Sequence, residues 1–331
     1  MGKIIEGRRQ FSDRRFAELK AELVGAPAIC GDKACVYAIG SFGRREASQH
    51  SDLDIFIVSL CHGKDREHKS RLTKLEEILL KADLIRASRA LGFPDFSKDG
   101  DFLQHHTSIS LIQTTGDRND DAINTFTARL LLLLESKPLA GEDVHIQVIN
   151  DVIAKYWSEF PEHNDCFMPA YLANDILRYW RTLCLNYEAR TSEKTPRDRA
   201  NRKIKNYKLK HSRMLTCYSA LLFLLYIYSE NGTVTVEDTQ TMVRLVPTER
   251  LESISERLGD PKLAEKFRTL IEKYELFLNV TSASEEELVE IFSDDAQAHR
   301  LRDEQSTFGE IAYDVLSSIG RENKFYRRLV I

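Results

Sequence analysis

The stretch Tyr37-Ala-Ile-Gly-Ser-Phe-Gly-Arg-Arg-Glu-Ala-Ser-Gln-His-Ser-Asp-Leu-Asp-Ile-Phe-Ile-Val58 decides the fold of this chain. Residues 36–39 and 53–60 are short apolar, β-branched or aromatic runs bounded by turn residues, which is typical of strands in a largely buried sheet. Side chains alternate between the two faces of a strand, so Asp52 and Asp54 are expected to point the same way. The pattern therefore predicts two carboxylates at one end of a sheet.

Two like charges at close range are unfavourable unless a cation or a proton lies between them. Divalent ions are the usual partner of paired carboxylates where phosphate chemistry follows, so Asp52 and Asp54 are predicted to be metal ligands and catalytic residues. The alternative is a solvated strand end, where Asp is common.

The second half of the motif is Gly40-Ser41, which is separated from Asp52 by ten intervening residues. Glycine allows close backbone approach or a positive φ, and the amides of such a turn at a helix start bind anions, with the serine hydroxyl as a further donor. We predict that Gly40 and Ser41 hold phosphate, together with Arg44 from the same motif.

Gly40-Ser41 followed by Asp52-x-Asp54 resembles the signature of the DNA polymerase β-type nucleotidyltransferase superfamily. The longer run through Arg44, Arg45 and Glu46 is similar to the PII-protein uridylyltransferases. The resemblance covers about residues 30–140 and implies a mixed sheet, two Mg²⁺ ions with Mn²⁺ as an alternative, and an NTP or dNTP substrate. The implied reaction transfers a nucleoside monophosphate to a hydroxyl and releases pyrophosphate.

The resembled superfamily usually carries a third carboxylate on a later strand. Residues 102–113 read as that strand but offer no acid within it, which leaves Asp101 before the strand and Asp120-Asp121 after it. We favour Asp120 and Asp121 as catalytic residues and Asp121 as the third metal ligand, because they precede a predicted helix over 122–136. Without a third carboxylate at the metals, the domain would only bind nucleotide.

Length and composition predict a soluble protein of two domains, and the motif with its resemblance and a helical second half predict an α+β fold. The chain has 331 residues, 42% of them hydrophobic and 30% charged, and a net charge of −4, so any polyanion contact must be a local patch. No signal peptide, membrane span or paired-cysteine metal motif is expected, which favours a cytoplasmic location and reduced thiols. We predict a nucleotidyltransferase domain over 1–143, a helical domain over 144–320 that completes the nucleotide cleft, and a basic, aromatic tail over 321–331.

Two groups of cations in the helical domain are candidate phosphate contacts. Arg178 and Arg181 share one face of a predicted helix over 169–187, where the alternative is a solvated face. Ten Lys or Arg residues and only two acids lie within 190–213. The superfamily resemblance implies a lysine and a hydroxyl that hold the triphosphate, which we carry over to Lys208 or Lys210 with Ser212; a solvated basic face is the alternative.

The acceptor hydroxyl stays open between another nucleotide, a protein side chain and Tyr326 in the tail. The layout, tail included, resembles the nucleotidyltransferase of the bacterial Hailong antiphage system. That resemblance implies an oligodeoxyadenylate product grown from Tyr326 and a protein effector as partner. No membrane insertion of this chain itself is expected, because no apolar run approaches the length of a membrane span. Tyr326 could instead anchor the tail to the fold.

Three other functions remain as alternatives. The first is a protein- or RNA-modifying nucleotidyltransferase like the PII uridylyltransferases. The second is a non-catalytic nucleotide-sensing module that keeps the fold. The third is an RNA-binding protein that uses the basic 190–213 stretch, with an affinity that falls steeply with salt.

Overall fold

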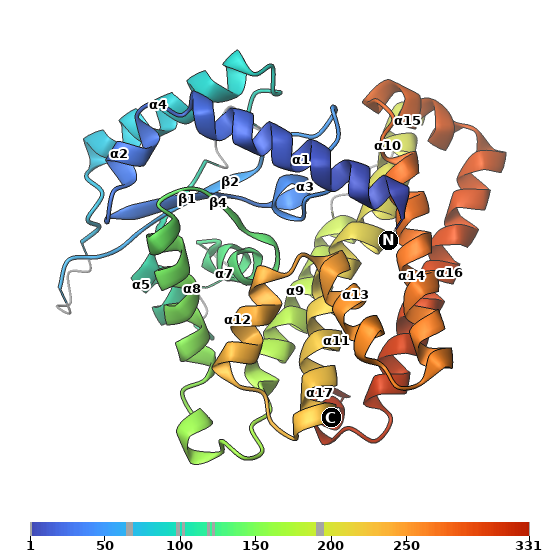
Figure 1. The fold of residues 1–331 in the computed structure, drawn as a ribbon. Coiled ribbons are helices and arrows are strands. Elements are labelled where there is room, and N and C mark those ends of the chain that lie inside the picture. Colours follow the sequence, from blue (N-terminus) through green and yellow to red (C-terminus); the bar gives the residue numbers. More distant parts are fainter. Residues whose placement is uncertain are drawn as a thin grey trace. The chain divides into compact units, whose positions relative to one another are not determined.

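The structure is a computed structural model that describes residues 2–63, 69–96, 100, 103–117, 120, 123–189 and 195–330. It is an α+β protein with a mixed, four-stranded sheet (Figure 1). The chain divides into two compact units, which we call the sheet unit (Glu6–Lys155) and the helical unit (Met1–Ile5 with Tyr156–Ile331). The boundary lies beyond the predicted one at 143/144, so that helix α8 (Glu142–Tyr156) belongs to the sheet unit up to Lys155.

Four strands form the sheet in the order β3-β2-β1-β4. Their bounds are β1 (Ala34–Ala38), β2 (Ile55–Ser59), β3 (His105–Thr107) and β4 (Lys137–Ala140). β1 is antiparallel to β2 and β4, whereas β2 and β3 are parallel. Ala38 pairs with Ile55, so the chain leaves β1 at the point where it enters β2.

One face of the sheet is covered by α1 (Lys3–Glu22), α2 (Ala26–Cys30) and α4 (Lys74–Ala90) (Figure 1). Phe16 and Leu19 of α1 and Leu84 of α4 belong to one buried apolar cluster with the strand residues Val36 and Ile57. On the other side lie α5 (Ser108–Gln113), α7 (Thr125–Glu135) and α8 (Figure 1). Alternation along the strands explains this arrangement, since successive side chains enter opposite layers.

The predicted third strand over 102–113 is wrong beyond Thr107, where α5 begins. Thr107 and Ser110 form a capping box: each side-chain oxygen accepts the other residue's backbone N–H at 3.1 Å. This reciprocal cap satisfies two donors of a helix start and therefore ends the strand.

The sequence analysis missed β4. The leucine-rich helix α7 ends at Glu135, and Lys137 precedes Pro138, which biases Lys137 toward extended backbone. Proline lacks a backbone donor and is confined to sheet edges, which is the place that β4 occupies.

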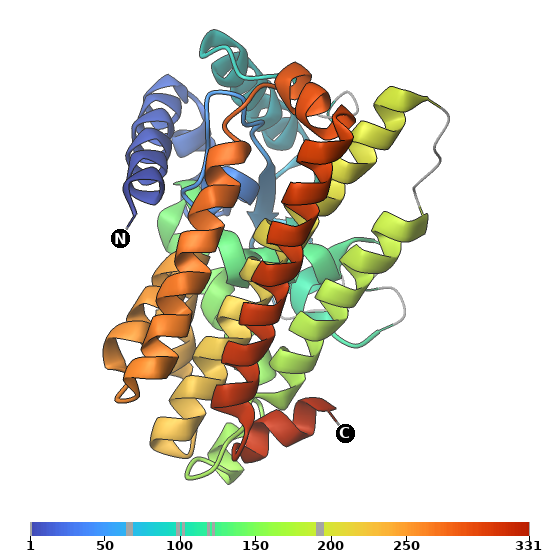
Figure 2. The ribbon, with the colours of Figure 1, turned by 90° about the vertical axis from the view of Figure 1, so that its right-hand side faces the viewer.

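The helical unit is built around α11 (Met214–Asn231), which is apolar on nearly all sides and buried along most of its length. Figure 2 shows its long helices. The others are α9 (Ala170–Ala189), α10 (Pro196–Lys208), the π-helical turn η3 (Leu209–Arg213), α12 (Val236–Arg244), α13 (Pro247–Arg257), α14 (Pro261–Val280), α15 (Glu285–Ser293), α16 (Asp295–Gly320) and α17 (Lys324–Val330). None of the helices described here is both long and apolar enough to cross a membrane.

The first turn of α1 belongs to the helical unit. The backbone N–H groups of Ile4 and Ile5 donate to Glu275 Oε1 of α14 at 2.6 and 3.2 Å. A carboxylate on the first N–H groups of a helix satisfies donors that have no partner within the helix, and it is favoured by the helix dipole. One helix therefore contributes to both units.

Within the predicted tail over 321–331, the residues Lys324–Val330 form the helix α17. Phe325 is fully buried with its ring 5.8 Å from that of Tyr228, and Asn323 Nδ2 donates to the carbonyl of Leu225 at 3.0 Å. These contacts tie α17 to α11.

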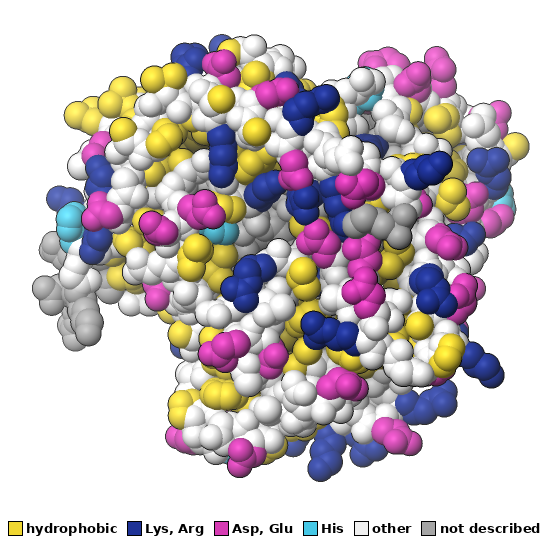
Figure 3. Space-filling model, viewed as in Figure 1, with side chains coloured by type: hydrophobic (Ala, Val, Ile, Leu, Met, Phe, Trp, Pro, Cys, Tyr) yellow, Lys and Arg dark blue, Asp and Glu magenta, His cyan; other side chains and the backbone are white. Residues whose placement is uncertain are grey.

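Apolar side chains remain exposed on α4. Leu75, Ile78 and Leu79 are 74%, 54% and 59% exposed. Figure 3 shows hydrophobic side chains along this edge of the sheet unit, over α2 and α4.

Candidate active site

The Gly-Ser turn is the short helix α3 (Gly40–Gly43), which follows β1 through Ile39. Gly40 has φ +65°, a left-handed conformation that glycine adopts without steric cost. Its N–H donates to Glu135 Oε1 at 3.1 Å in a buried contact. The Gly40 amide, which the sequence predicts as a phosphate donor, is thus engaged by a carboxylate in this conformation.

Asp54 lies directly opposite this turn. The Ile39 N–H donates to the Asp54 carbonyl at 3.0 Å, which continues the antiparallel pairing of β1 and β2 by one residue. A Cβ atom added to Gly40 would lie 2.8 Å from Asp54 Oδ2, so the carboxylate occupies the space that any other side chain would need. The structure therefore brings the Gly40-Ser41 turn and the Asp52–Asp54 segment together, with Asp52 exposed and Asp54 half-buried.

A buried charge network holds the turn. Arg44 Nε donates to Glu46 Oε2 at 2.8 Å and Arg44 Nη1 donates to Glu135 Oε2 at 2.7 Å. All three side chains are buried, and charged groups are tolerated there because they pair and hydrogen-bond. The sequence predicts a nucleotide contact for Arg44, but its guanidinium here fixes α3 between two carboxylates.

Gly43 brings the turn into direct contact with the end of α7. A Cβ atom at Gly43 would lie 1.8 Å from the backbone oxygen of Glu135. Glu135 thus contacts the turn twice, through its carboxylate at Gly40 and through its backbone at Gly43.

Helix α1 fastens the segment that follows the turn. Arg8 Nη1 donates to the Glu46 carbonyl at 3.3 Å, and Ser12 Oγ accepts the Ala47 N–H at 2.9 Å. Asp13 binds Arg45; burial alone would raise the pKa of Asp13, but hydrogen bonds from Arg45 and Lys137 hold that pKa below its usual value. These contacts keep Arg45 at φ +59°, which is uncommon for a residue with a side chain.

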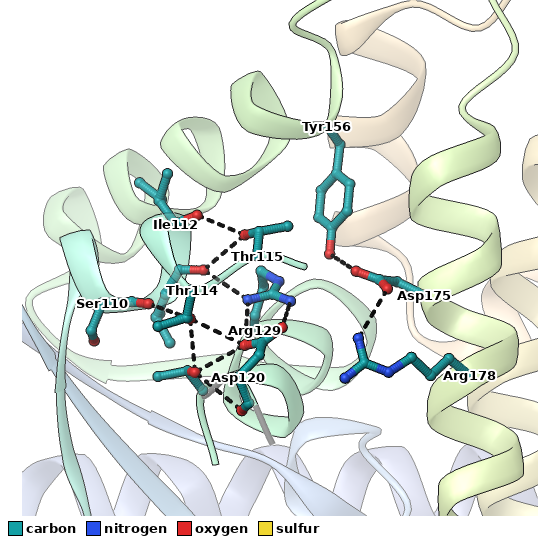
Figure 4. Close-up of polar contacts among 11 residues, drawn as sticks. Ser110, Ile112, Thr114, Thr115, Asp120, Arg129, Tyr156, Asp175 and Arg178 are labelled. Atoms are coloured by element: carbon teal, nitrogen blue, oxygen red, sulfur yellow. Dashed lines mark hydrogen bonds and ion pairs between the residues drawn. The ribbon is translucent and has the colours of Figure 1, made fainter. Parts of the chain in front are cut away.

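Asp120 lies in a different buried cluster of the sheet unit (Figure 4). Its carboxylate accepts Arg129 Nη1 at 3.0 Å and the Thr125 and Thr114 hydroxyls at 2.9 and 3.1 Å, and Arg129 Nη2 binds its second oxygen. Asp120 and Arg129 are both fully buried. In this conformation Asp120 is a partner of Arg129, and the predicted catalytic role finds no support in its position.

Asp121 and Asp101, the other candidates for the third carboxylate, lie outside the described residues. Within the part of the chain that is described, no three His, Cys, Asp or Glu side chains come together as a metal site. Asp52 and Asp54 still fit Mg²⁺, which is commonly held by one or two carboxylates together with waters and substrate phosphates.

Arg178 and Arg181 extend from α9 of the helical unit. Tyr156 Oη donates to Asp175 Oδ2 at 2.7 Å, and Arg178 Nη1 lies 3.7 Å from Asp175 Oδ1 (Figure 4). Arg181 is exposed. Arg178 therefore shares a buried carboxylate with Tyr156, whereas Arg181 faces solvent.

Lys208, Lys210 and Ser212 lie at the junction of α10 with η3. Lys208 is exposed, and Lys210 Nζ lies 5.3 Å from the centre of the Trp180 ring. The Ser212 hydroxyl is buried and donates to the Lys208 carbonyl at 2.9 Å. Ser212 thus bonds to its own helix, and the two lysines carry the accessible charge.

Tyr326 lies on α17 with a half-buried side chain. Its N–H donates to Asn323 Oδ1 at 3.3 Å, and its ring covers Gly320, where an added Cβ would lie 2.5 Å from Tyr326 Cγ. The ring contact is that of an aromatic anchor, the alternative that the sequence leaves open for this residue.

Sequence reasoning missed Glu135. The available signal is an acid that ends a run of five leucines, because a buried carboxylate needs a donor and a cation nearby. Nothing in the sequence identifies Gly40 and Arg44 as those partners.

No protein-family model matches this chain, and no curated protein matches it in sequence.

Proposed function

We propose that this protein is a Mg²⁺-dependent nucleotidyltransferase that moves a nucleoside monophosphate from an NTP or dNTP to a hydroxyl acceptor. The observation that carries the proposal is the position of the Asp54 carboxylate beside Gly40, where an added Cβ atom would lie 2.8 Å from Asp54 Oδ2. Glu135 and Arg44 hold the turn through hydrogen bonds. A glycine-serine turn beside the Asp52–Asp54 segment, at the ends of β1 and β2, suits phosphoryl transfer, where positioning and charge neutralisation supply most of the catalysis.

The chain's own residues would act as follows. Asp52 and Asp54 hold the metal, which when bound neutralises phosphate charge and lowers the pKa of an attacking hydroxyl. The hydroxyl and amide of Ser41 are the donors that the turn offers to a phosphate oxygen, since the Gly40 amide binds Glu135. The network of Glu135, Arg44 and Glu46 keeps α3 rigid, so the hydrogen-bond donors of Ser41 need little reorganisation during the reaction.

The test is the intact mass of the purified protein and the release of pyrophosphate, measured with Mg²⁺ and each ribo- and deoxyribonucleoside triphosphate in turn. We expect one triphosphate to be consumed, and the Asp52→Asn/Asp54→Asn variant to release no pyrophosphate while it unfolds at the wild-type temperature. Consumption that persists in this variant would contradict the assignment.

The same assay addresses the acceptor. Growth of the protein mass that disappears in Tyr326→Phe would assign self-priming from Tyr326 and an oligonucleotide product. Pyrophosphate release at constant protein mass would assign a free acceptor, which we favour because Phe325 and Asn323 fix α17 to α11.

A non-catalytic nucleotide-binding module is the second candidate. It is favoured by one observation: within the described residues, Asp52 and Asp54 are not joined by a third ligand. Calorimetry with a non-hydrolysable triphosphate analogue, combined with the pyrophosphate assay, distinguishes the enzyme from the binding module. A binding module binds the analogue but consumes no triphosphate.

A further inference from the structure

We propose that the helical unit binds single-stranded nucleic acid along the seam between α9 and the continuous segment formed by α10 and η3. We call this surface the α9/α10 seam. Its principal residues are Trp180 and Tyr187 on α9, Arg202, Lys205 and Lys208 on α10, and Lys210 on η3. The inference does not depend on the proposed transfer reaction, because it concerns a surface without Asp52 or Asp54.

The seam concentrates positive charge. α10 carries six Lys or Arg residues and one acid, Asp198, in a protein whose net charge is −4. Arg197 and Lys203 lie within ion-pair distance of Glu285 and Asp295, and Arg202, Lys205 and Lys208 are the α10 cations of the seam. Among the described residues, no acid lies within ion-pair distance of the exposed Lys205 and Lys208. Local clusters of this kind attract phosphate backbones even when the whole protein is acidic.

Two of the cations lie on aromatic rings of α9. The Arg202 guanidinium is 5.9 Å from the centre of the Tyr187 ring, and its Nε donates to Tyr187 Oη at 3.3 Å. Lys210 Nζ is 5.3 Å from the centre of the Trp180 ring, which in turn lies 6.0 Å from that of Tyr218. A cation held over a ring has a defined position, which reduces the entropy lost when it binds a phosphate.

The two cation-ring pairs define the direction of the seam. Tyr187 meets Arg202 and Trp180 meets Lys210, so α9 and α10 run in opposite directions along a shared edge, as Figure 2 shows. The ring positions are seven residues apart on α9, which corresponds to about 10 Å of helix. Cys184 lies between them in the sequence and is half-buried. Burial raises the pKa of its thiol, and the charge of Glu188 also raises it while that of Lys210 opposes the rise.

This chemistry fits a single strand better than other polyanions. Half-buried Tyr187 and the guanidinium of Arg202 offer flat surfaces on which an unpaired base can stack, and the lysines offer charge to the backbone. A duplex hides its base faces, and an anionic lipid surface or an acidic protein would use the lysines but not the ring of Tyr187. The π-helical turn η3 supports a functional role for the site, because π-helical turns inside α-helices are frequent at such places.

The test is fluorescence anisotropy of the full chain with a dye-labelled, mixed-sequence 20-nucleotide DNA, its RNA counterpart and the corresponding DNA duplex. The titrations are made in EDTA at several salt concentrations, so that metal-dependent chemistry cannot contribute. We expect both single strands to bind more tightly than the duplex, with an affinity that falls as salt rises. A higher affinity for one of the two single strands would identify DNA or RNA as the preferred ligand.

Two seam variants separate charge from stacking. Arg202→Gln/Lys205→Gln should lower the slope of log affinity against log salt by roughly 0.7 per lost phosphate contact. Tyr187→Leu should weaken single-strand binding by about fivefold to a hundredfold, the range for loss of one stacked base, and leave the salt slope unchanged. Lys262→Gln/Arg302→Gln is the matched control, since it removes the same charge from exposed positions elsewhere in the helical unit.

Three results would overturn the proposal, provided that the variants keep the wild-type circular dichroism spectrum and melting temperature. They are equal binding by wild type and both seam variants, equal weakening by the control variant, and binding of the duplex as tight as that of the single strands. Binding to vesicles of anionic lipid with no affinity for either strand would assign the seam to a membrane surface instead.

Discussion

Gly43 is the residue at which the turn of the candidate site tolerates no side chain. A Cβ atom there would lie 1.8 Å from the Glu135 oxygen, which is a backbone atom of a packed helix end and cannot rotate away. We expect Gly43→Ala to lower the free energy of unfolding by about 1–3 kcal/mol, the range for added atoms in a packed interior. Urea denaturation measures this.

Gly309 in α16 is the matched control, because an added Cβ atom there would meet nothing within 4 Å. Gly309→Ala should raise the free energy of unfolding by roughly 0.5–1 kcal/mol, since glycine is costly inside a helix. Equal effects of the two substitutions would contradict the packing described for Gly43.

Amide substitution is predicted to destabilise the protein at Asp120 and to leave its stability nearly unchanged at Asp52. Asp120→Asn leaves the fully buried Arg129 without its charge partner, which should cost about 3–5 kcal/mol of stability. Asp52 is exposed, so Asp52→Asn should change stability by less than about 0.5 kcal/mol. Thermal unfolding of the two variants tests this, and a stable Asp120→Asn protein that has lost nucleotide turnover would return Asp120 to the catalytic residues.

The sequence was sufficient to identify the residues of the Gly-Ser turn and the aspartates, but not the distant residues that hold the turn in place. Strand alternation and the Gly-Ser turn were sufficient to nominate Gly40 and Asp54, because both signals are local. The partner of Gly40 is 95 residues away along the chain, and no local pattern carries that information. The role of Arg44 depended on the same distant carboxylate.

Among the elements, α17 carries a prediction of its own. Phe325 is the buried anchor of this helix, so Phe325→Ala should release α17 from α11. We expect rapid loss of the final residues to a protease that cleaves after Lys or Arg, with little change in the rate at which the rest of the chain is cut. Tyr326→Phe keeps the ring that covers Gly320 and should be cut as slowly as wild type.

The elements that the sequence predicted least well are the short ones. Long amphipathic helices such as α9 and α14 are specified by apolar spacing over many residues. β3 has three residues and β4 has four, so neither offers enough alternation to distinguish a strand from an adjacent helix. The capping box of Thr107 and Ser110 ends β3 and begins α5, and Pro138 keeps the backbone extended in β4 after α7 ends.

For the molecule as a whole, three buried histidines predict a loss of stability in mild acid. Burial lowers the pKa of His145 and His211 to about 4, and burial together with the neighbouring His105 does the same for His106. In the unfolded chain each has a pKa near 6.5, so below that pH the unfolded state binds more protons than the folded state. Stability should therefore fall as the pH drops from about 6.5 toward 4, by ~1.4 kcal/mol per pH unit for each histidine.

Chemical denaturation at pH 7, 6 and 5 measures this dependence. His211 lies between the rings of Phe277 and Phe308, each with its centre 4.7 Å away, and burial there disfavours its charged form. His211→Gln should reduce the pH dependence of the helical unit and leave that of the sheet unit, which contains His106 and His145. An unchanged pH dependence in His211→Gln would show that this histidine is not charged on unfolding.

The contribution of α1 to both units has a consequence for how such a protein can evolve. The helical unit is discontinuous, since it uses the first residues of the chain as well as everything after Lys155. A single genetic crossover, wherever it falls, cannot transfer the helical unit complete, and one placed at its main boundary separates Glu275 from the helix start that it caps. The two halves of this gene are therefore expected to be inherited together, and their exchange with other lineages would require a compensating change at the amino terminus.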